Sequence, residues 1–236
     1  MRRILALVFL IFIPLLLMAQ DVLRGEVMVE MEPITYRAVI ERQGPLEDER
    51  AYRQFLNETA YRLALERAAM LFSAQIYGWS FYYDIGERAR GIAEEFELTP
   101  LGEIPWGDPR LVVTHASFHN HVLSMWADYR PSEAQSRRLE MWRMGRIRTV
   151  QAIGRGPLSN PMDFLETTAI QRAALEDSAR AAVRALLQAE ERNRPKEARG
   201  YISLQIFPTF WMDAGQWTTQ ARFRVEITEI VPFAVH

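Results

Sequence analysis

The pattern of hydrophobic and polar residues changes twice over the first third of the chain. Residues 22–31 alternate, with Leu23 and Val27 among the apolar positions on one side, and this predicts a half-buried β-strand. Apolar residues then recur at helical spacing from Glu49 to Tyr77, and the later part of this stretch is apolar nearly all round. This predicts a long helix with one end buried. Gly78 follows at once, as is typical of a helix C-terminus.

Shorter patterns follow this helix. The aromatic run Trp79–Tyr83 predicts a β-strand, and Gly86–Glu95 predicts a short helix. Prolines and glycines are concentrated over Pro100–Pro109, which predicts a loop. We expect two further strands at Leu111–Thr114 and His121–Tyr129.

The second half of the chain contains one ambiguous segment and one clear helix. Ser132–Ile147 is compatible with a helix, and Ile147–Ile153 could continue as a strand. Gly154–Pro157 then predicts a loop. Asn160 followed by a proline is a strong helix start, and Pro195 prevents this second long helix from continuing.

The C-terminal region alternates again and predicts a β-hairpin. Its arms are Tyr201–Phe207 and Trp217–Val231, and Asp213–Gly215 supplies turn residues between them. Together the elements predict an α+β fold, in which two long helices pack on a mainly antiparallel sheet with the β-hairpin at the C-terminus.

The first residues have the layout of a secretory signal peptide. Two arginines precede Ile4–Leu17, fourteen residues without a charge, and this stretch is shorter than the roughly 20 residues of a membrane-spanning helix. Cleavage after Ala19 removes residues 1–19 and leaves no transmembrane span, whereas an uncleaved anchor is the alternative. The chain has no cysteine, and export without disulfides is typical of bacteria. We therefore expect a periplasmic or secreted bacterial protein.

Composition narrows the class of protein. The 236 residues are 49% hydrophobic, which excludes a disordered chain. We expect residues 21–236 to form a single α+β domain, with 21–130 and 131–236 as alternative sub-modules. The formal charge of −2 gives no basic field for nucleic acid. Because the sequence also lacks the common catalytic signatures and any thiol, we expect a protein that is not an enzyme.

Part of the first half resembles small secreted envelope modules related to flagellar-assembly proteins of the T and P type. In these modules a strand precedes an alanine-rich helix that ends in glycine before another strand. The matching stretch is residues 59–78, from Thr59 through the alanines to Ile76-Tyr77-Gly78. The resemblance implies a non-enzymatic envelope or periplasmic flagellar component, and it carries no catalytic residues with it.

Three of the four histidines lie close together, at His115, His119 and His121. On an unbroken strand His119 and His121 share a face, where two imidazoles can bind zinc or copper. These three residues are the candidate metal ligands, and surface histidines near a turn are the alternative interpretation.

Two groups of residues are candidates for binding a partner protein. An arginine cluster could hold an anionic partner, although a solvated basic helix face is the ordinary explanation; it contains Arg137, Arg138, Arg143 and Arg146. An aromatic group lies beside the predicted hairpin turn, where burial is hard to arrange; it contains Phe210, Trp211 and Trp217.

These observations lead to three functional hypotheses. The first is an exported, non-enzymatic periplasmic or envelope protein that acts by protein–protein contacts, for example as a structural component of an envelope or periplasmic flagellar assembly. The second is a metal-binding periplasmic protein that uses the histidine cluster. The third is a carrier of a small ligand or lipid, which requires a large apolar cavity.

Overall fold

The computed structural model describes residues 22–31, 36–45, 48–86, 91, 93–144, 147–190 and 195–232. The predicted signal peptide and Arg146 lie outside these residues. The helices are α2 (Tyr36–Gln43), α3 (Glu49–Ile76), α4 (Glu133–Met141), the 3-10 helix η2 (Pro161–Glu166) and α5 (Thr167–Glu190). The strands are β1 (Leu23–Glu30), β2 (Trp79–Asp84), β3 (Glu95–Pro100), β4 (Leu111–His119), β5 (Val122–Tyr129), β6 (Arg148–Leu158), β7 (Pro195–Leu204), β8 (Thr209–Asp213) and β9 (Gln216–Pro232).

The strands form two sheets, where the sequence predicted one. The small sheet has the order β1-β5-β4, and the large sheet has the order β3-β2-β7-β9-β6, with β8 also paired to β9. Every strand pairing in the described part of the chain is antiparallel. The expectation of a mixed helix and strand fold with mainly antiparallel pairing is therefore confirmed. None of the described helices is long and apolar enough to cross a membrane.

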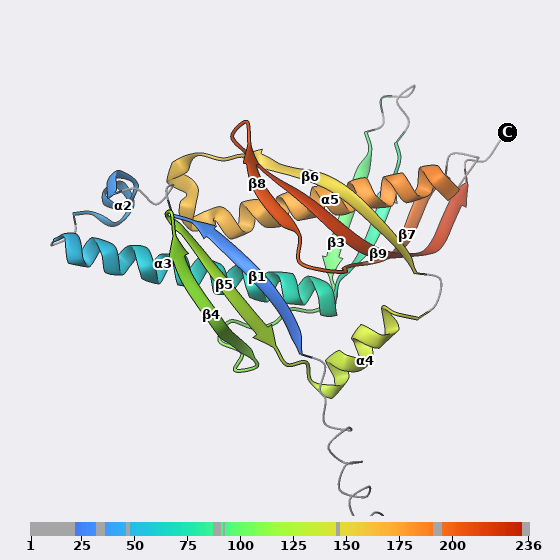
Figure 1. Cartoon of the computed structure of the whole chain (residues 1–236). Coiled ribbons are helices and arrows are strands. Elements are labelled where there is room, and N and C mark those ends of the chain that lie inside the picture. Colours follow the sequence, from blue (N-terminus) through green and yellow to red (C-terminus); the bar gives the residue numbers. More distant parts are fainter. Residues whose placement is uncertain are drawn as a thin grey trace, which may run out of the picture.

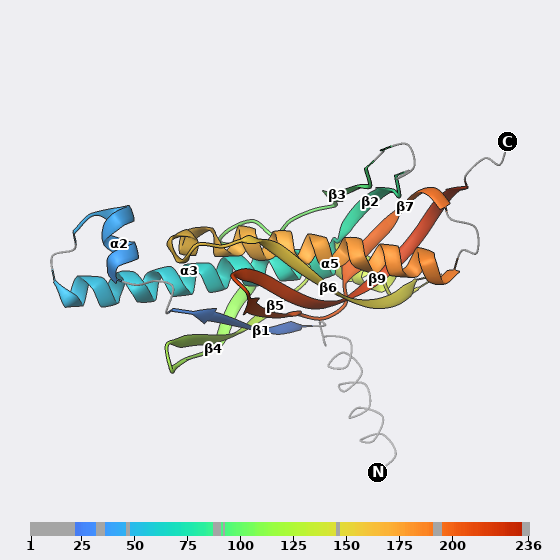
Figure 2. The ribbon, with the colours of Figure 1, turned by 90° about the horizontal axis from the view of Figure 1, so that it is seen from above.

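Helix α3 connects the two sheets. One side of the helix, which includes Ala60, Phe72 and Ile76, packs with the small sheet in one hydrophobic core. Met70, Leu71 and Ala74 face another way and pack with α5 and the large sheet in a second core. Figures 1 and 2 show α3 and α5 running side by side, with the small sheet lying across one side of α3. The predicted burial of the C-terminal half of this helix is confirmed, since nearly every residue from Thr59 to Ile76 is buried or half-buried.

Local signals explain where α3 begins and ends. The Asp48 carboxylate accepts a hydrogen bond from the Ala51 N–H at 2.8 Å, which satisfies a free donor of the first turn. At the other end Gly78 has φ +65°, and a Cβ there would lie 2.3 Å from the Ile202 carbonyl oxygen. Glycine is required at this position both for its backbone conformation and for the close approach of β7.

Strand β6 corrects the predicted loop at Gly154–Pro157, because these residues continue the strand. A Cβ at Gly154 would lie 2.1 Å from the Ser178 backbone nitrogen, and one at Gly156 would lie 2.8 Å from the Ile170 carbonyl oxygen. The glycines are therefore places where α5 packs directly on the strand. The helix predicted from Pro161 is a 3-10 helix for its first six residues, and the α-helix begins at Thr167.

Two other predictions need correction. The short helix predicted over Gly86–Glu95 is not found in the described part of that segment, and Glu95 instead begins β3, while 87–90 and 92 lie outside the described residues. The C-terminal hairpin exists, but its tight turn joins β8 to β9 through Ala214 and Gly215, which both have positive φ. Strand β7 pairs with the later half of β9.

Candidate functional site

One face of the small sheet is not covered by any described element. Val27, Val29, Leu123 and Met125 point toward α3 and are buried in the first core. The alternate residues point the other way, and among them Met28 is 55% and Trp126 37% exposed. Figure 2 shows the small sheet with α3 on one side only. We call the opposite surface the open face, formed by the outward residues of β1, β5 and β4.

Trp126 lies at the middle of the open face. Its register partners are Glu26 on β1 and His115 on β4, so the indole lies between strands on both sides. The next outward residue of β5, Ser124, donates a hydrogen bond to the Glu26 carboxylate at 2.5 Å. An exposed tryptophan is thus fixed on a regular sheet with polar groups around it, which is the arrangement common at protein–protein interfaces.

An ion pair closes one end of this face. The Arg24 guanidinium donates two hydrogen bonds to the Asp128 carboxylate, both at 2.7 Å. This bidentate contact holds the pKa of Asp128 below its ordinary value, chiefly through the hydrogen bond from Arg24. The pair crosses between β1 and β5 and provides a polar rim beside the apolar residues.

The structure separates the predicted histidine cluster. His115 and His119 lie on β4 and belong to the open face, whereas His121 lies in the turn to β5, with φ +60°. The expectation that His119 and His121 share a strand face is wrong, because the chain reverses at Asn120 and His121. Among the described residues there is no group of three or more histidines and carboxylates arranged to hold a metal ion.

The predicted arginine cluster also divides. Arg137 pairs with Glu133 one turn earlier on α4, and the Arg138 guanidinium lies 5.9 Å from the centre of the Tyr77 ring. Arg143 is exposed after the end of α4, and Arg146 lies outside the described residues. The described arginines therefore point to different neighbours and do not form one basic face.

The aromatic group near the hairpin turn is mostly turned inward. Trp217 is only 6% exposed, and Phe210 and Trp211 are half-buried. The prediction of an exposed group is wrong for Trp217, because this side chain points from β9 toward the protein interior. The Arg67 guanidinium lies 6.0 Å from the ring centres of both Phe210 and Trp217.

Arg67 is a residue that the sequence analysis missed. It lies on the buried part of α3, is 4% exposed and donates a hydrogen bond to the Met28 carbonyl oxygen. Burial lowers its pKa from the ordinary value of arginine to about 10. The signal was present in the sequence, since two charged residues, Glu66 and Arg67, interrupt the apolar stretch between Leu63 and Met70.

A polar network joins the small sheet to α4. The Asp108 carboxylate accepts hydrogen bonds from the Arg110 guanidinium at 2.9 and 2.6 Å and from the Tyr129 hydroxyl at 3.2 Å. The Gln135 amide donates to the hydroxyls of Tyr129 at 3.0 Å and Tyr77 at 2.7 Å. These contacts, above all that from Arg110, lower the pKa of Asp108 to about 2. These polar groups form hydrogen bonds with one another, so the network holds the small sheet to α4.

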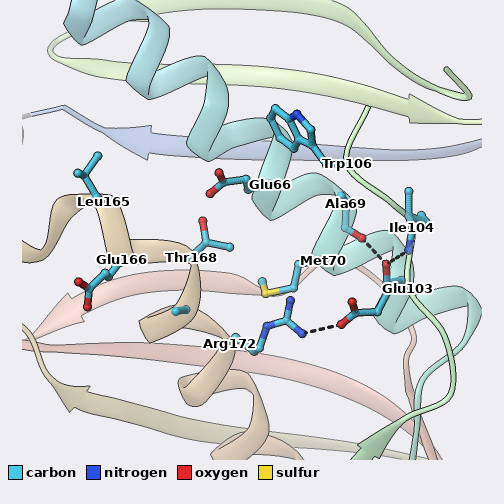
Figure 3. Close-up of a pocket in the computed structure, with 12 residues that line it drawn as sticks. Glu66, Ala69, Met70, Glu103, Ile104, Trp106, Leu165, Glu166, Thr168 and Arg172 are labelled. Atoms are coloured by element: carbon cyan, nitrogen blue, oxygen red, sulfur yellow. Dashed lines mark hydrogen bonds and ion pairs between the residues drawn. The ribbon is translucent and has the colours of Figure 1, made fainter. Parts of the chain in front are cut away.

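A cavity of about 410 Å³ lies between α3, the start of α5 and the segment after β3 (Figure 3). Its wall is partly apolar and partly charged. It is lined by Glu66, Ala69, Met70, Ser73, Glu103, Ile104, Trp106, Leu165, Glu166, Thr168, Ala169 and Arg172. The Arg172 guanidinium lies 3.4 Å from the Glu103 carboxylate, and the Ser73 hydroxyl accepts from the Ile104 N–H at 2.8 Å. Figure 3 shows Glu66 and Thr168 directed toward the same space from the two helices.

Comparisons with known proteins show the family of this chain. An uncharacterised protein of Treponema pallidum (strain Nichols) is 27% identical over 171 residues, which are 72% of this chain and 69% of that protein. No solved structure matches. The model of an uncharacterised protein family matches residues 16–233. Because this match covers most of the sequence, the chain belongs to that uncharacterised family.

Proposed function

We propose that this chain is an exported, non-enzymatic protein of the bacterial periplasm or envelope, which acts by binding another protein as a structural component of an assembly. The observation that carries the proposal is the open face with Trp126 at its middle. The proposal of export rests on the apolar stretch Ile4–Leu17, which follows two arginines.

The chemistry of the open face defines the partner surface. Trp126 and Met28 are residue types that are enriched where proteins bind one another, and a tryptophan held on a sheet loses little conformational entropy on binding. The Glu26 and Asp128 carboxylates already accept hydrogen bonds from Ser124 and Arg24. They therefore form a polar rim, which does not have to be desolvated when a partner binds. The matching partner presents an apolar pocket for an indole, surrounded by polar groups.

Photo-crosslinking in the native cell tests the binding surface. A photoreactive residue in place of Met28, on the open face, is compared with one in place of Ile153, which is exposed on β6 of the large sheet. We expect one discrete adduct from the Met28 position and none from Ile153. We also expect Trp126→Ala to reduce the yield of this adduct at least tenfold, since a central tryptophan contributes about 2 kcal/mol or more to an interface.

The matched control for Trp126→Ala is Trp106→Ala, because Trp106 is 63% exposed but lies away from the open face, at the cavity. Equal adduct yields from the two variants would exclude the open face as the binding surface.

Cell fractionation tests the proposal that the protein is exported. Full-length protein found in the cytoplasm alone would contradict export.

The cavity favours a second candidate function, the binding of a small apolar molecule. Its volume of about 410 Å³ lies in the range of ligand sites, and its wall combines Met70, Ile104 and Leu165 with three glutamates and one arginine. Two of these glutamates have arginine partners, Glu103 with Arg172 and Glu66 with Arg62, so the apolar part of the wall is left to bind a ligand. Hexanol is therefore expected to raise the midpoint of thermal unfolding, and the absence of any shift would exclude an apolar ligand site.

A further inference from the structure

The outer edge of β4 is an unpaired strand edge. β4 is the last strand of the small sheet, and its residues are exposed except for Leu111 and Ala116, which are half-buried. The Met31 N–H donates to the His121 carbonyl oxygen, which fixes the register of the ladder. By the alternation of antiparallel pairing, the main-chain groups of His115, Ser117 and His119 then face β5. Those of Ala116 and Phe118 face away from the sheet.

Beyond the β-bulge between Val113 and His115, this edge lacks the charged residues and prolines that keep edge strands from pairing. The sequence of β4, LVVTHASFH, contains no lysine, arginine, aspartate, glutamate or proline. Charged residues and prolines are the usual means by which proteins prevent edge-to-edge association. Val112, Val113 and Phe118 are also exposed along β4.

The other free edges among the described strands carry charged residues or prolines, which oppose pairing with another strand. β3 carries Glu95, Glu97 and Pro100, and β6 carries two arginines and Pro157. On β8 these residues are Asp213 at the end and Pro208 just before the start. The edge of β1 carries charged residues, and Arg67 bonds to its Met28 carbonyl. Among the free edges of the described strands, β4 is therefore the one that has no charged residue or proline to oppose pairing with another strand.

We propose that two copies of this chain associate through their β4 edges, in antiparallel pairing about a two-fold axis. The two small sheets then form one continuous six-stranded sheet. A second copy fits because an antiparallel strand edge is complementary to itself under two-fold symmetry, and because β4 brings no side chain that is always charged to the contact. The pairing satisfies the outward main-chain groups of Ala116 and Phe118 and covers the exposed Phe118 and Val113 side chains.

The association also has a consequence for the open face. In the paired sheet the open faces of the two copies lie side by side on one surface, so that Trp126 is presented twice. The proposal goes beyond the proposed function, because self-association needs only the β4 edge and does not need Trp126 or a partner.

Mass measurement in solution on the whole exported chain tests the proposal. We expect the mass of two chains for the wild type. Ser117→Lys places a charge on the exposed side of β4 and is expected to weaken the dimer at least tenfold, giving the mass of one chain at micromolar concentration. The matched control is Thr99→Lys, which makes the same change in charge on the exposed edge strand β3 and is expected to remain a dimer.

Disulfide formation gives a second measurement that does not depend on how the lysine variant folds. The chain has no cysteine, so a single cysteine introduced at each position from Leu111 to Phe118 reports only its own contact with a second copy. We expect efficient cross-linking under mild oxidation at the position nearest the axis, and none from Thr99→Cys. A wild type that is monomeric up to 100 µM, or a dimer that Ser117→Lys leaves intact, would overturn the proposal. Trp126→Ala should leave the dimer unchanged, which separates this test from that of partner binding.

Discussion

The Arg67 guanidinium on α3 donates a hydrogen bond to the main-chain carbonyl oxygen of Met28 on β1. A buried cation thus satisfies a backbone acceptor on the free edge of the small sheet. The same guanidinium lies 6.0 Å from the ring centres of both Phe210 and Trp217 of the large sheet. One side chain therefore contacts both sheets, and no carboxylate bonds to it among the described residues.

Replacing Arg67 by alanine is expected to destabilise the fold. The change leaves the Met28 carbonyl without its donor and opens a space beneath Phe210 and Trp217, for a loss of about 2–4 kcal/mol in the free energy of unfolding. Urea denaturation measures the loss. Arg62→Ala on the same helix is the control, because Arg62 forms a half-exposed pair with Glu66 and its removal costs about 0.5 kcal/mol or less. Similar losses from both variants would contradict the role assigned to Arg67.

Asp108 gives the fold an acid-sensitive contribution. Its pKa in the folded state is about 2, below the ordinary value of 3.8, so the unfolded chain binds the proton more readily than the folded protein. The stabilisation is therefore complete above about pH 4 and is lost as the pH falls toward 2. We expect Asp108→Asn to lower the free energy of unfolding by about 2 kcal/mol at pH 7 and to reduce its dependence on pH below 4.

The control for this pH dependence is Asp213→Asn, because Asp213 is exposed and pairs with an equally exposed Arg155. Its pH profile between 2 and 7 should match that of the wild type. A profile for Asp108→Asn that retains the full loss of stability below pH 4 would show that other carboxylates cause it.

Gly154 is expected to tolerate no side chain. A methyl group there would meet the Ser178 nitrogen and the Ala174 carbonyl of α5, so Gly154→Ala must push the helix away from β6. The expected loss is about 3 kcal/mol or more, by overpacking. Gly107→Ala is the comparison, since Gly107 has open space but φ +77°, and about 1 kcal/mol is expected there from backbone strain alone. Thermal unfolding of both variants distinguishes lack of space from backbone strain.

Trp217 and Trp211 should respond differently to truncation. Trp217→Ala removes a buried indole and is expected to lower the free energy of unfolding by about 3–5 kcal/mol. Trp211→Ala removes a half-buried ring on β8 and should cost less than half as much. Circular dichroism during urea unfolding provides the measurement, and a Trp217→Ala protein as stable as the wild type would place this side chain outside the core.

Local signals predicted the elements whose ends are fixed by nearby residues. Helix α3 follows from its apolar spacing and from Gly78, and the strand β1 follows from alternation. A turn near the histidines was one of the interpretations, but its position at Asn120 and His121 was not predicted, because a tight turn with positive φ at two residues usually contains glycine. The sequence gives no direct sign of it beyond the asparagine.

Tertiary contacts decided the features that local patterns could not show. Gly154 was interpreted as a loop residue because glycine is common in turns, but its role is to let α5 approach β6. The histidines were grouped by their spacing, and the chain reversal at His121 separates them. The open face could not be predicted at all, because the exposure of Trp126 depends on which side of the small sheet α3 covers.

The large sheet pairs strands that are far apart along the chain, since Trp79 of β2 lies beside Ile202 of β7. Between these strands the polypeptide makes β4, β5 and α4, which pack elsewhere. Such distant pairing slows folding, because the ends of a long loop must meet before the contact forms. A nascent chain therefore completes the large sheet only after β7 and β9 have been synthesised.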